Sequence, residues 1–138
     1  LASHTDFLPQ DENDLLLDEA IASLAVEIAV RRHAGTLESV CTPMGWSYLQ
    51  RGKDLRDVQK LIFTGGALIG ARNMKKIAAH ALFLGSEPMS LCPLKAEVLV
   101  DRSYILSAMG LLSVLRPDAA LRIMKKELCS HGTVQQEA

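Results

Sequence analysis

Thr64, Gly65 and Gly66 form the stretch of this sequence whose residue types best suit chemistry. They follow the apolar run Leu61 to Phe63, which predicts a buried strand, and precede a helical pattern from Arg72 to Leu84. Glycine has no Cβ, so its backbone can approach a ligand closely. A helix start offers unpaired N–H groups and a positive dipole end, which suit phosphate or another polar group. A Gly-Gly pair is also typical of a plain connection between strand and helix, so the turn alone leaves both interpretations open.

Asp101 is the second candidate, because it follows another short apolar run, Ala96 to Val100. Strand, helix and strand in this order predict a parallel pair with a right-handed crossover. Ligands of such sheets bind beyond the carboxyl ends of the strands. We therefore expect Thr64 and Asp101 to lie at one edge of the sheet, where Asp101 could also cap the helix that follows.

Other elements surround this unit. The apolar spacing predicts a long helix from Leu15 to His33, capped by Asn13 or Asp14 and stopped by Gly35. The patterns that follow predict a β-hairpin over 37–42 and 46–50, with Trp46 and Tyr48 covering the core. A short helical turn is expected from Asp54 to Val58. Two more helices are predicted, one over 104–115 and a last one from Pro117 to Leu128.

Gly110 interrupts the helix expected over 104–115. A glycine inside a helix costs about 1 kcal/mol relative to alanine, so it indicates close packing or the close approach of a ligand. From Gly132 onward the sequence is polar and predicts a tail. The expected fold class is α/β, a short mixed sheet with a hairpin and flanking helices, divided into a lead-in over 1–13, one subdomain over 14–129 and a polar tail over 130–138.

The composition excludes several classes of protein. The 138 residues are 49% apolar, with 15 basic and 16 acidic side chains and a net charge of −1. Neither this balance nor the 4% aromatic content suits nucleic-acid binding. The three cysteines are far apart and predict no metal site or disulfide framework, which favours a reducing cytoplasm. No apolar run is long enough for a membrane span. The chain begins without Met, so we expect a piece of a longer protein.

Several stretches together, in this order and spacing, resemble the carboxyl-terminal part of the MutL/GlmL family, over roughly Ala20 to Leu128. These are accessory proteins of the adenosylcobalamin-dependent methylaspartate (glutamate) mutase. The stretches are Arg32-His33-Ala34-Gly35, Gln50-Arg51-Gly52-Lys53-Asp54-Leu55, Thr64-Gly65-Gly66, Asp101-Arg102-Ser103-Tyr104-Ile105-Leu106, Ala108-Met109-Gly110-Leu111-Leu112-Ser113 and Arg116-Pro117-Asp118-Ala119-Ala120-Leu121.

The resemblance implies part of an actin-like ATPase (ribonuclease H-like) fold and a chaperone-like role in maintaining or reactivating the cobalamin mutase. The intact protein would use ATP or ADP with Mg²⁺. Its partners would be the mutase subunits and the missing amino-terminal half of the same chain, with no nucleic acid or membrane involved. The residues implied at the adenosine side of the nucleotide are Thr64, Gly65, Gly66 and Ala67, and the candidates for the edge of the site are Asp101, Gly110 and Lys53.

Two departures from the family pattern limit what this chain can do alone. Phe63 stands where the family commonly has the first glycine of Gly-Thr-Gly-Gly. No Asp-x-Gly-Ser/Thr pattern occurs in the 138 residues, and in the actin-like fold the phosphate hairpin and the metal-positioning aspartates lie in the first half. We therefore expect no ATP hydrolysis by this chain on its own.

Other functions stay open. One is part of a small-molecule kinase of the same superfamily, for which no catalytic Asp is convincingly placed. Another is a non-catalytic interaction domain that contacts a mutase subunit and binds no nucleotide. A dinucleotide-binding fold is disfavoured because the turn lacks the third glycine of Gly-x-Gly-x-x-Gly. Cys41 and His33 are close in the sequence, but no orienting group completes a nucleophilic triad.

Overall fold

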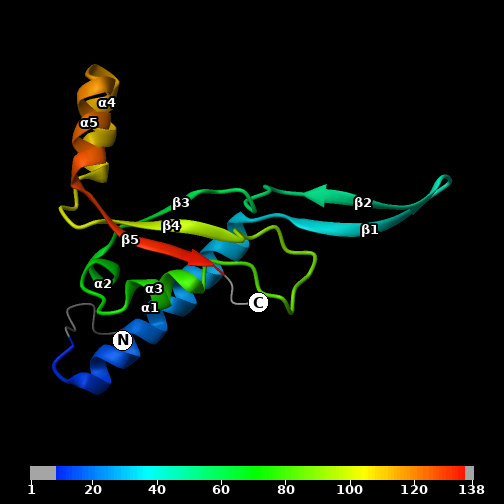
Figure 1. The fold of residues 1–138 in the computed structure, drawn as a ribbon, viewed down its shortest axis with the longest axis horizontal. Coiled ribbons are helices and arrows are strands. Elements are labelled where there is room, and N and C mark those ends of the chain that lie inside the picture. The colour runs from blue at the N-terminus through cyan, green and yellow to red at the C-terminus, as the bar shows by residue number, and fades with distance from the viewer. Residues whose placement is uncertain (1–8, 136–138) are drawn as a thin grey trace.

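The computed structural model describes residues 9–135. The predicted lead-in and tail lie partly outside this range. The elements are α1 (Glu12–His33), β1 (Thr36–Thr42), β2 (Gly45–Arg51), β3 (Lys60–Phe63), α2 (Gly66–Ile69), α3 (Met74–Ala79), β4 (Lys95–Asp101), α4 (Leu106–Leu115), α5 (Pro117–Glu127) and β5 (Leu128–Gln135). Their arrangement is mixed α/β, as the sequence predicts (Figure 1).

A three-stranded mixed sheet lies at the centre, in the order β3-β4-β5. β3 and β4 are parallel, with Phe63 opposite Val100, and this confirms the predicted parallel pair. β4 and β5 are antiparallel, with Ala96 opposite Val134. The expectation of a polar tail from Gly132 is therefore wrong as far as Gln135. Most side chains of β5 are exposed, so its sequence looks polar, but its backbone pairs with β4 and completes the sheet.

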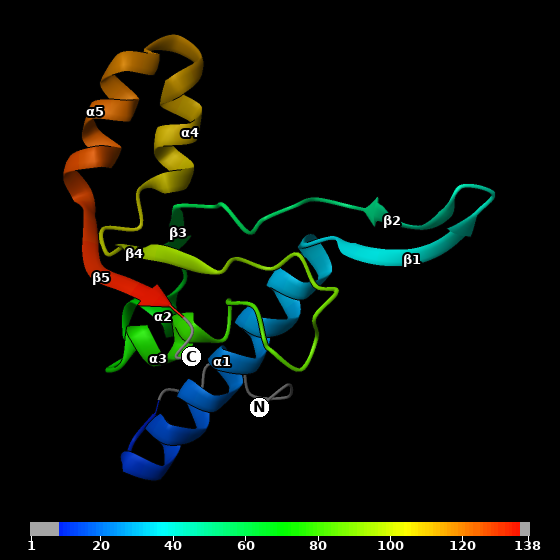
Figure 2. The same ribbon diagram turned by 45° about the vertical axis from the view of Figure 1, so that its right-hand side comes forward.

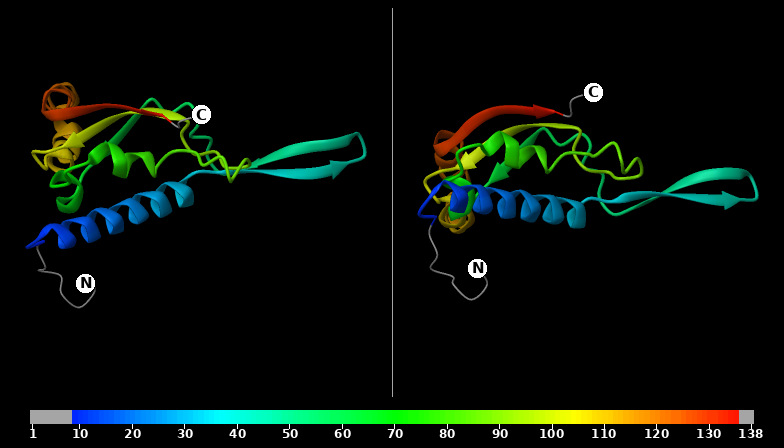
Figure 3. Two further views of the ribbon diagram at one scale, coloured as in Figure 1. Left: turned by 60° about the horizontal axis from the view of Figure 1, so that its bottom comes forward. Right: turned by 90° about the horizontal axis from the view of Figure 1, so that it is seen from below.

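The helices α1, α2 and α3 cover one face of this sheet, as Figure 3 shows. Their apolar side chains meet the inward face of the strands in a single core. Phe63 belongs to this core, so its side chain points inward. The buried core residues are Ala22, Val26, Phe63, Met74, Ile77, Ala78, Ala81, Leu82, Val98, Val100 and Val134.

Helix α1 confirms the long helix predicted from the sequence, although its ends differ. The cap is Asp11, whose carboxylate accepts a hydrogen bond from the amide of Asp14 at 2.8 Å, and is neither Asn13 nor Asp14. At the other end the C-cap is Ala34, in extended conformation. Gly35 therefore does not stop the helix through a left-handed conformation. It allows a close crossing of two chain segments instead, as discussed below.

The helix expected over 72–84 is shorter than predicted. α2 is a single turn that begins directly at Gly66, and α3 starts anew because Asn73 caps it by accepting from the amide of Lys76 at 3.1 Å. After Ala79 the hydrogen bonds tighten to the three-residue spacing of turns. The amide of Phe83 then donates to Pro93 O, which ends the helix well before Gly85.

The β1–β2 hairpin has the predicted strands but not the predicted location. Cys41 pairs with Trp46, and Ser39 pairs with Tyr48. The hairpin projects away from the sheet and the helices, at the end opposite to α4 and α5 (Figure 2). Trp46 is 77% exposed and Tyr48 is 65% exposed, so the expectation that they cover the core is wrong. Alternating strand residues identify a shared face but do not say whether anything packs on it.

Helices α4 and α5 pack on each other and extend away from the sheet, as Figure 2 shows. Both helices were predicted, and the apolar side of α4 that faces α5 is only partly covered. Met109 and Leu112 are half-buried, whereas Ala108 is exposed. The opposite side of α4 presents large apolar side chains to solvent, namely Leu111, Val114 and Leu115.

Glu97 on the central strand offers a test of this sheet. Its carboxylate accepts a hydrogen bond from the Ser130 hydroxyl on β5 at 2.9 Å and lies 3.4 Å from the Lys60 ammonium on β3. The Ser130 hydrogen bond, followed by the Lys60 interactions, holds the pKa of Glu97 below its ordinary value. The charged carboxylate therefore bridges all three strands.

We expect Glu97→Gln to lower the melting temperature slightly at neutral pH, because the neutral glutamine amide cannot form an ion pair with Lys60. A lowered folded-state pKa gives stability that is present above the unfolded pKa of about 4.3 and is lost as the pH falls through the folded value. The difference between the two proteins should therefore shrink on acidification. Thermal unfolding followed by circular dichroism between neutral and acid pH measures it, and a difference that grows towards acid would contradict the assignment.

Candidate functional site

Thr64 and Asp101 meet at the carboxyl ends of β3 and β4, as the topology predicts. The Thr64 hydroxyl donates a hydrogen bond to Asp101 Oδ2 at 3.3 Å. Asp101 is only 1% exposed, so its side chain lies beneath the surface rather than in solvent. Two residues 37 positions apart are thus brought together at one edge of the sheet.

Asp101 caps the segment that leads into α4. Its Oδ1 accepts from the amide of Ile105 at 3.1 Å, and its Oδ2 accepts from the amide of Leu106 at 3.0 Å. Together with the Thr64 hydroxyl, these two amides give the buried carboxylate three hydrogen-bond donors. Hydrogen bonds to a carboxylate are stronger than those between neutral groups. Asp101 is therefore a positioning residue that ties the glycine turn to the start of α4.

The glycine turn has an open backbone. Gly65 has a φ of +120°, a conformation that L side chains rarely adopt, so glycine is required there. Gly66 begins α2 in ordinary helical geometry, and a Cβ built on it would meet no atom within 4 Å. Because no other part of the described chain covers Gly66, a ligand can reach this backbone.

A groove of about 420 Å³ lies between the turn and α1. Its walls are mostly apolar, and Asp18 supplies a carboxylate. A second hollow of about 340 Å³ adjoins it and shares Asp18, Gly66 and Ala67. The residues that line the groove are Asp18, Ile21, Ala22, Ala25, Val26, Ala29, Gly65, Gly66, Ala67 and Leu68.

The α1 wall of this groove was not predicted. Its signal in the sequence is the set of small residues Ala22, Ala25 and Ala29, which recur at three- and four-residue spacing on one side of α1. Small side chains there leave room between the helix and the turn. Asp18, one turn before them, is the charged group that this wall contributes.

Lys53 and Gly110 are not brought to this groove. Lys53 lies after the hairpin, where its ammonium is 3.3 Å from His33 Nε2 beside the end of α1. Figure 3 shows that the hairpin leaves the molecule at the opposite end from α4. Gly110 lies inside α4, and a Cβ there would meet no atom within 4 Å. The close packing expected at Gly110 is therefore absent among residues 9–135.

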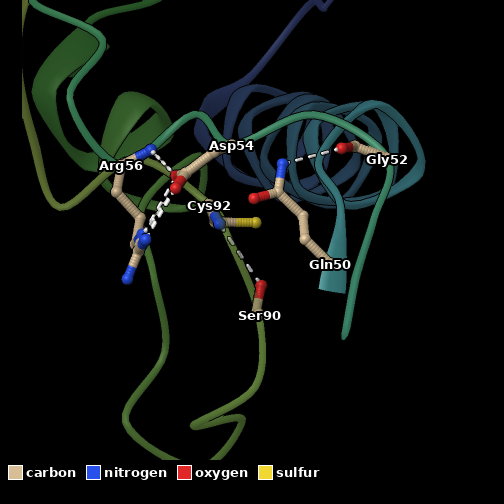
Figure 4. A network of polar contacts seen from close by, with 6 residues as sticks. All are labelled: Gln50, Gly52, Asp54, Arg56, Ser90 and Cys92. Atoms are coloured by element: carbon tan, nitrogen blue, oxygen red, sulfur yellow. Dashed lines mark hydrogen bonds and ion pairs between the residues drawn. The ribbon is translucent and has the colours of Figure 1, made fainter. Parts of the chain in front are cut away.

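A polar network beside the hairpin is structural (Figure 4). The Arg56 guanidinium donates to both carboxylate oxygens of Asp54, and these hydrogen bonds hold the pKa of Asp54 below its ordinary value and raise the pKa of Arg56. The amide of Arg56 also donates to Asp54 at 3.0 Å. The segment Asp54 to Val58 is thus a single turn with Asp54 at its start, closed by the hydrogen bond from the Val58 amide to Leu55 O, as the expected short helical turn requires.

The described residues suit some kinds of site and not others. Between positions 9 and 135, no three His, Cys, Asp or Glu side chains gather closely enough to hold a metal ion. Within the same range no helix has the length and apolar character needed to cross a membrane. The groups exposed at this edge are the glycine backbone, apolar side chains and single polar groups such as Asp18.

The fold and the site define an α/β domain that presents a glycine turn, beside an apolar groove, at the carboxyl edge of a mixed sheet. The family model described as MutL protein matches residues 1–128. The chain is 44% identical over 127 residues to Protein MutL of Clostridium tetanomorphum, an alignment that covers 92% of this chain and 28% of that protein. This chain belongs to the MutL family, and the resemblance noted in the sequence is confirmed.

The chain thus spans 28% of the length of the curated relative it matches. No solved protein structure matches it.

Proposed function

We propose that this chain is the nucleotide-binding carboxyl-terminal part of an ATP-dependent, chaperone-like accessory protein of the cobalamin-dependent glutamate mutase. Membership of the MutL family supports the accessory role. The observation that carries the nucleotide-binding part is the open Gly65-Gly66 backbone beside the apolar groove. Such a groove suits a flat ring, and the glycine backbone suits the sugar and phosphate that follow it.

The proposal assigns no hydrolysis to these residues. Asp101 is buried and already accepts three hydrogen bonds, so it is not free to activate a nucleophile. The carboxylates of residues 9–135 form no cluster for a metal ion, and we therefore assign no Mg²⁺ ligand to them. Catalytic groups would come from the part of the protein that the relative has beyond this chain. The same facts give the small-molecule kinase alternative no support.

A second candidate function is a non-catalytic interaction domain that contacts a mutase subunit. The observation that favours it is the projecting hairpin, on which Trp46 and Tyr48 present exposed aromatic side chains on one face. Aromatic residues of this kind are enriched at the centres of protein interfaces. In that case the glycine turn is only a connection, and nucleotide affinity is absent.

We expect Gly66→Val to weaken ATP and ADP binding by the full-length MutL-family protein at least tenfold. Valine at this position fills the space next to the groove without clashing, because no atom lies within 4 Å of the added Cβ. Gly65 is a poor choice for the same test, since its φ of +120° makes any side chain strained. Isothermal titration calorimetry with Mg²⁺ present measures the affinity.

The matched control is Ala79→Val, which adds the same branching on an exposed position of α3 and should leave binding unchanged. Circular dichroism must show that both variants are folded. If the unmodified full-length protein binds no nucleotide, the nucleotide proposal is wrong and the interaction domain is the better account. Equal affinities of Gly66→Val and Ala79→Val would exclude the turn as the binding element.

A further inference from the structure

Helix α1 has a second apolar side that the rest of the described chain leaves largely exposed, although its Ile21 also lines the groove at the glycine turn. Its large side chains recur at spacings of four, three and four residues, the pattern of a coiled-coil seam. They are between 40% and 56% exposed, although the opposite side of the helix is buried through Ala22 and Val26. We call this surface the outer seam, and it consists of Leu17, Ile21, Leu24 and Ile28.

A helix that is apolar on both sides normally packs between two partners. The first partner of α1 is the body of the molecule, where α3 contacts it. Figure 3 shows α1 running along the border of the molecule, with the sheet and α3 on its other side. The second partner must be another helix or surface that matches the outer seam.

The charges on α1 indicate which partner fits. Its first turn is acidic, with Glu12 and Asp14, and its last turn is basic, with Arg31, Arg32 and His33. When two copies of this helix lie antiparallel, the acidic end of each faces the basic end of the other, whereas a parallel pair would bring like charges together. The helix is thus complementary in charge to a reversed copy of itself.

The seam is also complementary in register. A two-fold axis between positions 22 and 23 places Leu17 opposite Ile28 and Ile21 opposite Leu24 of the other copy. The same axis places Asp14 opposite Arg31, which already pairs with Glu27 and Glu87 yet keeps 38% of its side chain exposed. One alignment therefore pairs the apolar positions and brings the acidic first turn of one copy to the basic last turn of the other.

We propose that the outer seam of α1 docks on the same surface of a second copy, in antiparallel orientation, to form a two-fold symmetric dimer. The outer seam runs over 12 residues of α1, from Leu17 to Ile28, which is about 18 Å of helix and just under two heptads of contact. Because α1 is already folded against the rest of its own chain, association carries no entropy cost for ordering this helix. The interface is isologous, as expected of a closed dimer.

Sedimentation velocity of the 138-residue chain over a range of concentrations tests the dimer. We expect the mass to approach twice that of one chain, and Leu24→Glu to weaken association at least a hundredfold. Leu24 does not line the groove at the glycine turn, so failure here is separate from failure of the nucleotide proposal. The control is Leu111→Glu, a charge on the exposed side of α4, which should leave the dimer unchanged.

A chain that stays monomeric at all concentrations overturns the proposal, and so does a dimer that Leu111→Glu disrupts while Leu24→Glu does not. Circular dichroism of both variants confirms that the helices are retained.

Spin labels on Asn13→Cys, with Cys41 and Cys129 replaced by serine, test the orientation. Antiparallel helices would hold the two labelled positions about 29 Å apart along the axis, whereas parallel helices would hold them about 10 Å apart. A distance near the shorter value contradicts the antiparallel arrangement.

Discussion

Asp101→Ala is expected to lower the free energy of unfolding by about 3–5 kcal/mol. The substitution removes a buried carboxylate that accepts from the Thr64 hydroxyl and from the amides of Ile105 and Leu106. The amides of Ile105 and Leu106 belong to half-buried residues and would lose their acceptor, whereas Thr64 is exposed and its hydroxyl can bind water instead. Each unsatisfied buried donor costs about 1–3 kcal/mol. Urea unfolding followed by circular dichroism and by Trp46 fluorescence measures the loss.

Two further variants make this result specific to the buried carboxylate. Asp118→Ala removes an exposed carboxylate from the first turn of α5 and should cost less than about 1 kcal/mol, the usual contribution of a charge at a helix end. Asp101→Asn keeps one acceptor oxygen but turns the other into a donor that faces amides, so an intermediate loss is expected. If Asp101→Ala costs no more than Asp118→Ala, the three hydrogen bonds do not hold the start of α4.

The same carboxylate links two parts of the molecule that the proposed function would use. Through Thr64 it contacts the turn that carries Gly65 and Gly66, and through Ile105 and Leu106 it contacts the start of α4. Tyr104, between these contacts, has a φ of +56°, which is rare for a bulky residue. Strained backbone conformations cluster at functional sites. Tyr104 therefore stands out at this edge of the sheet, although no pattern in the sequence points to it.

The parts of the fold that could be predicted depend on local periodicity and on chain topology. The apolar spacing of α1 is present in the sequence itself, and the parallel pairing of β3 with β4 follows from the rule for strand–helix–strand units. That rule alone places Thr64 beside Asp101, although 37 residues separate them. Local pattern and topology are therefore sufficient where neighbours in space follow from the order of the elements.

The parts that were missed depend on contacts that the local sequence does not encode. Only three positions of β5, Leu128, His131 and Val134, are buried or half-buried, so its pairing with β4 is what identifies it as a strand. Trp46 and Tyr48 share a face that nothing in the described chain covers. The groove wall on α1 is formed by alanines, which are typical of any helix. For β5 and for the groove the deciding partner lies far away in the sequence, and for the hairpin no described residue packs on the aromatic face.

Gly35→Ala is expected to destabilise the protein by about 3 kcal/mol or more. A Cβ at this position would lie 2.3 Å from Arg51 O, 2.7 Å from Gly52 C and 2.9 Å from Lys53 N. All three are backbone atoms, so no flexible side chain can move aside. The amide of Gly35 also donates to Lys53 O at 2.7 Å, and relieving the clash would break this bond. Chemical unfolding monitored by circular dichroism gives the change in free energy.

Gly110→Ala is the matched control, and its expected effect has the opposite sign. The added methyl group meets no atom within 4 Å, and alanine favours a helix interior over glycine by roughly 0.5–1 kcal/mol. The same chemical change should therefore stabilise the protein on α4 and destabilise it where the hairpin base crosses the end of α1. If both variants are stabilised, the two segments do not approach each other as closely as Gly35 and Gly52 indicate, and the position of the hairpin relative to α1 is wrong.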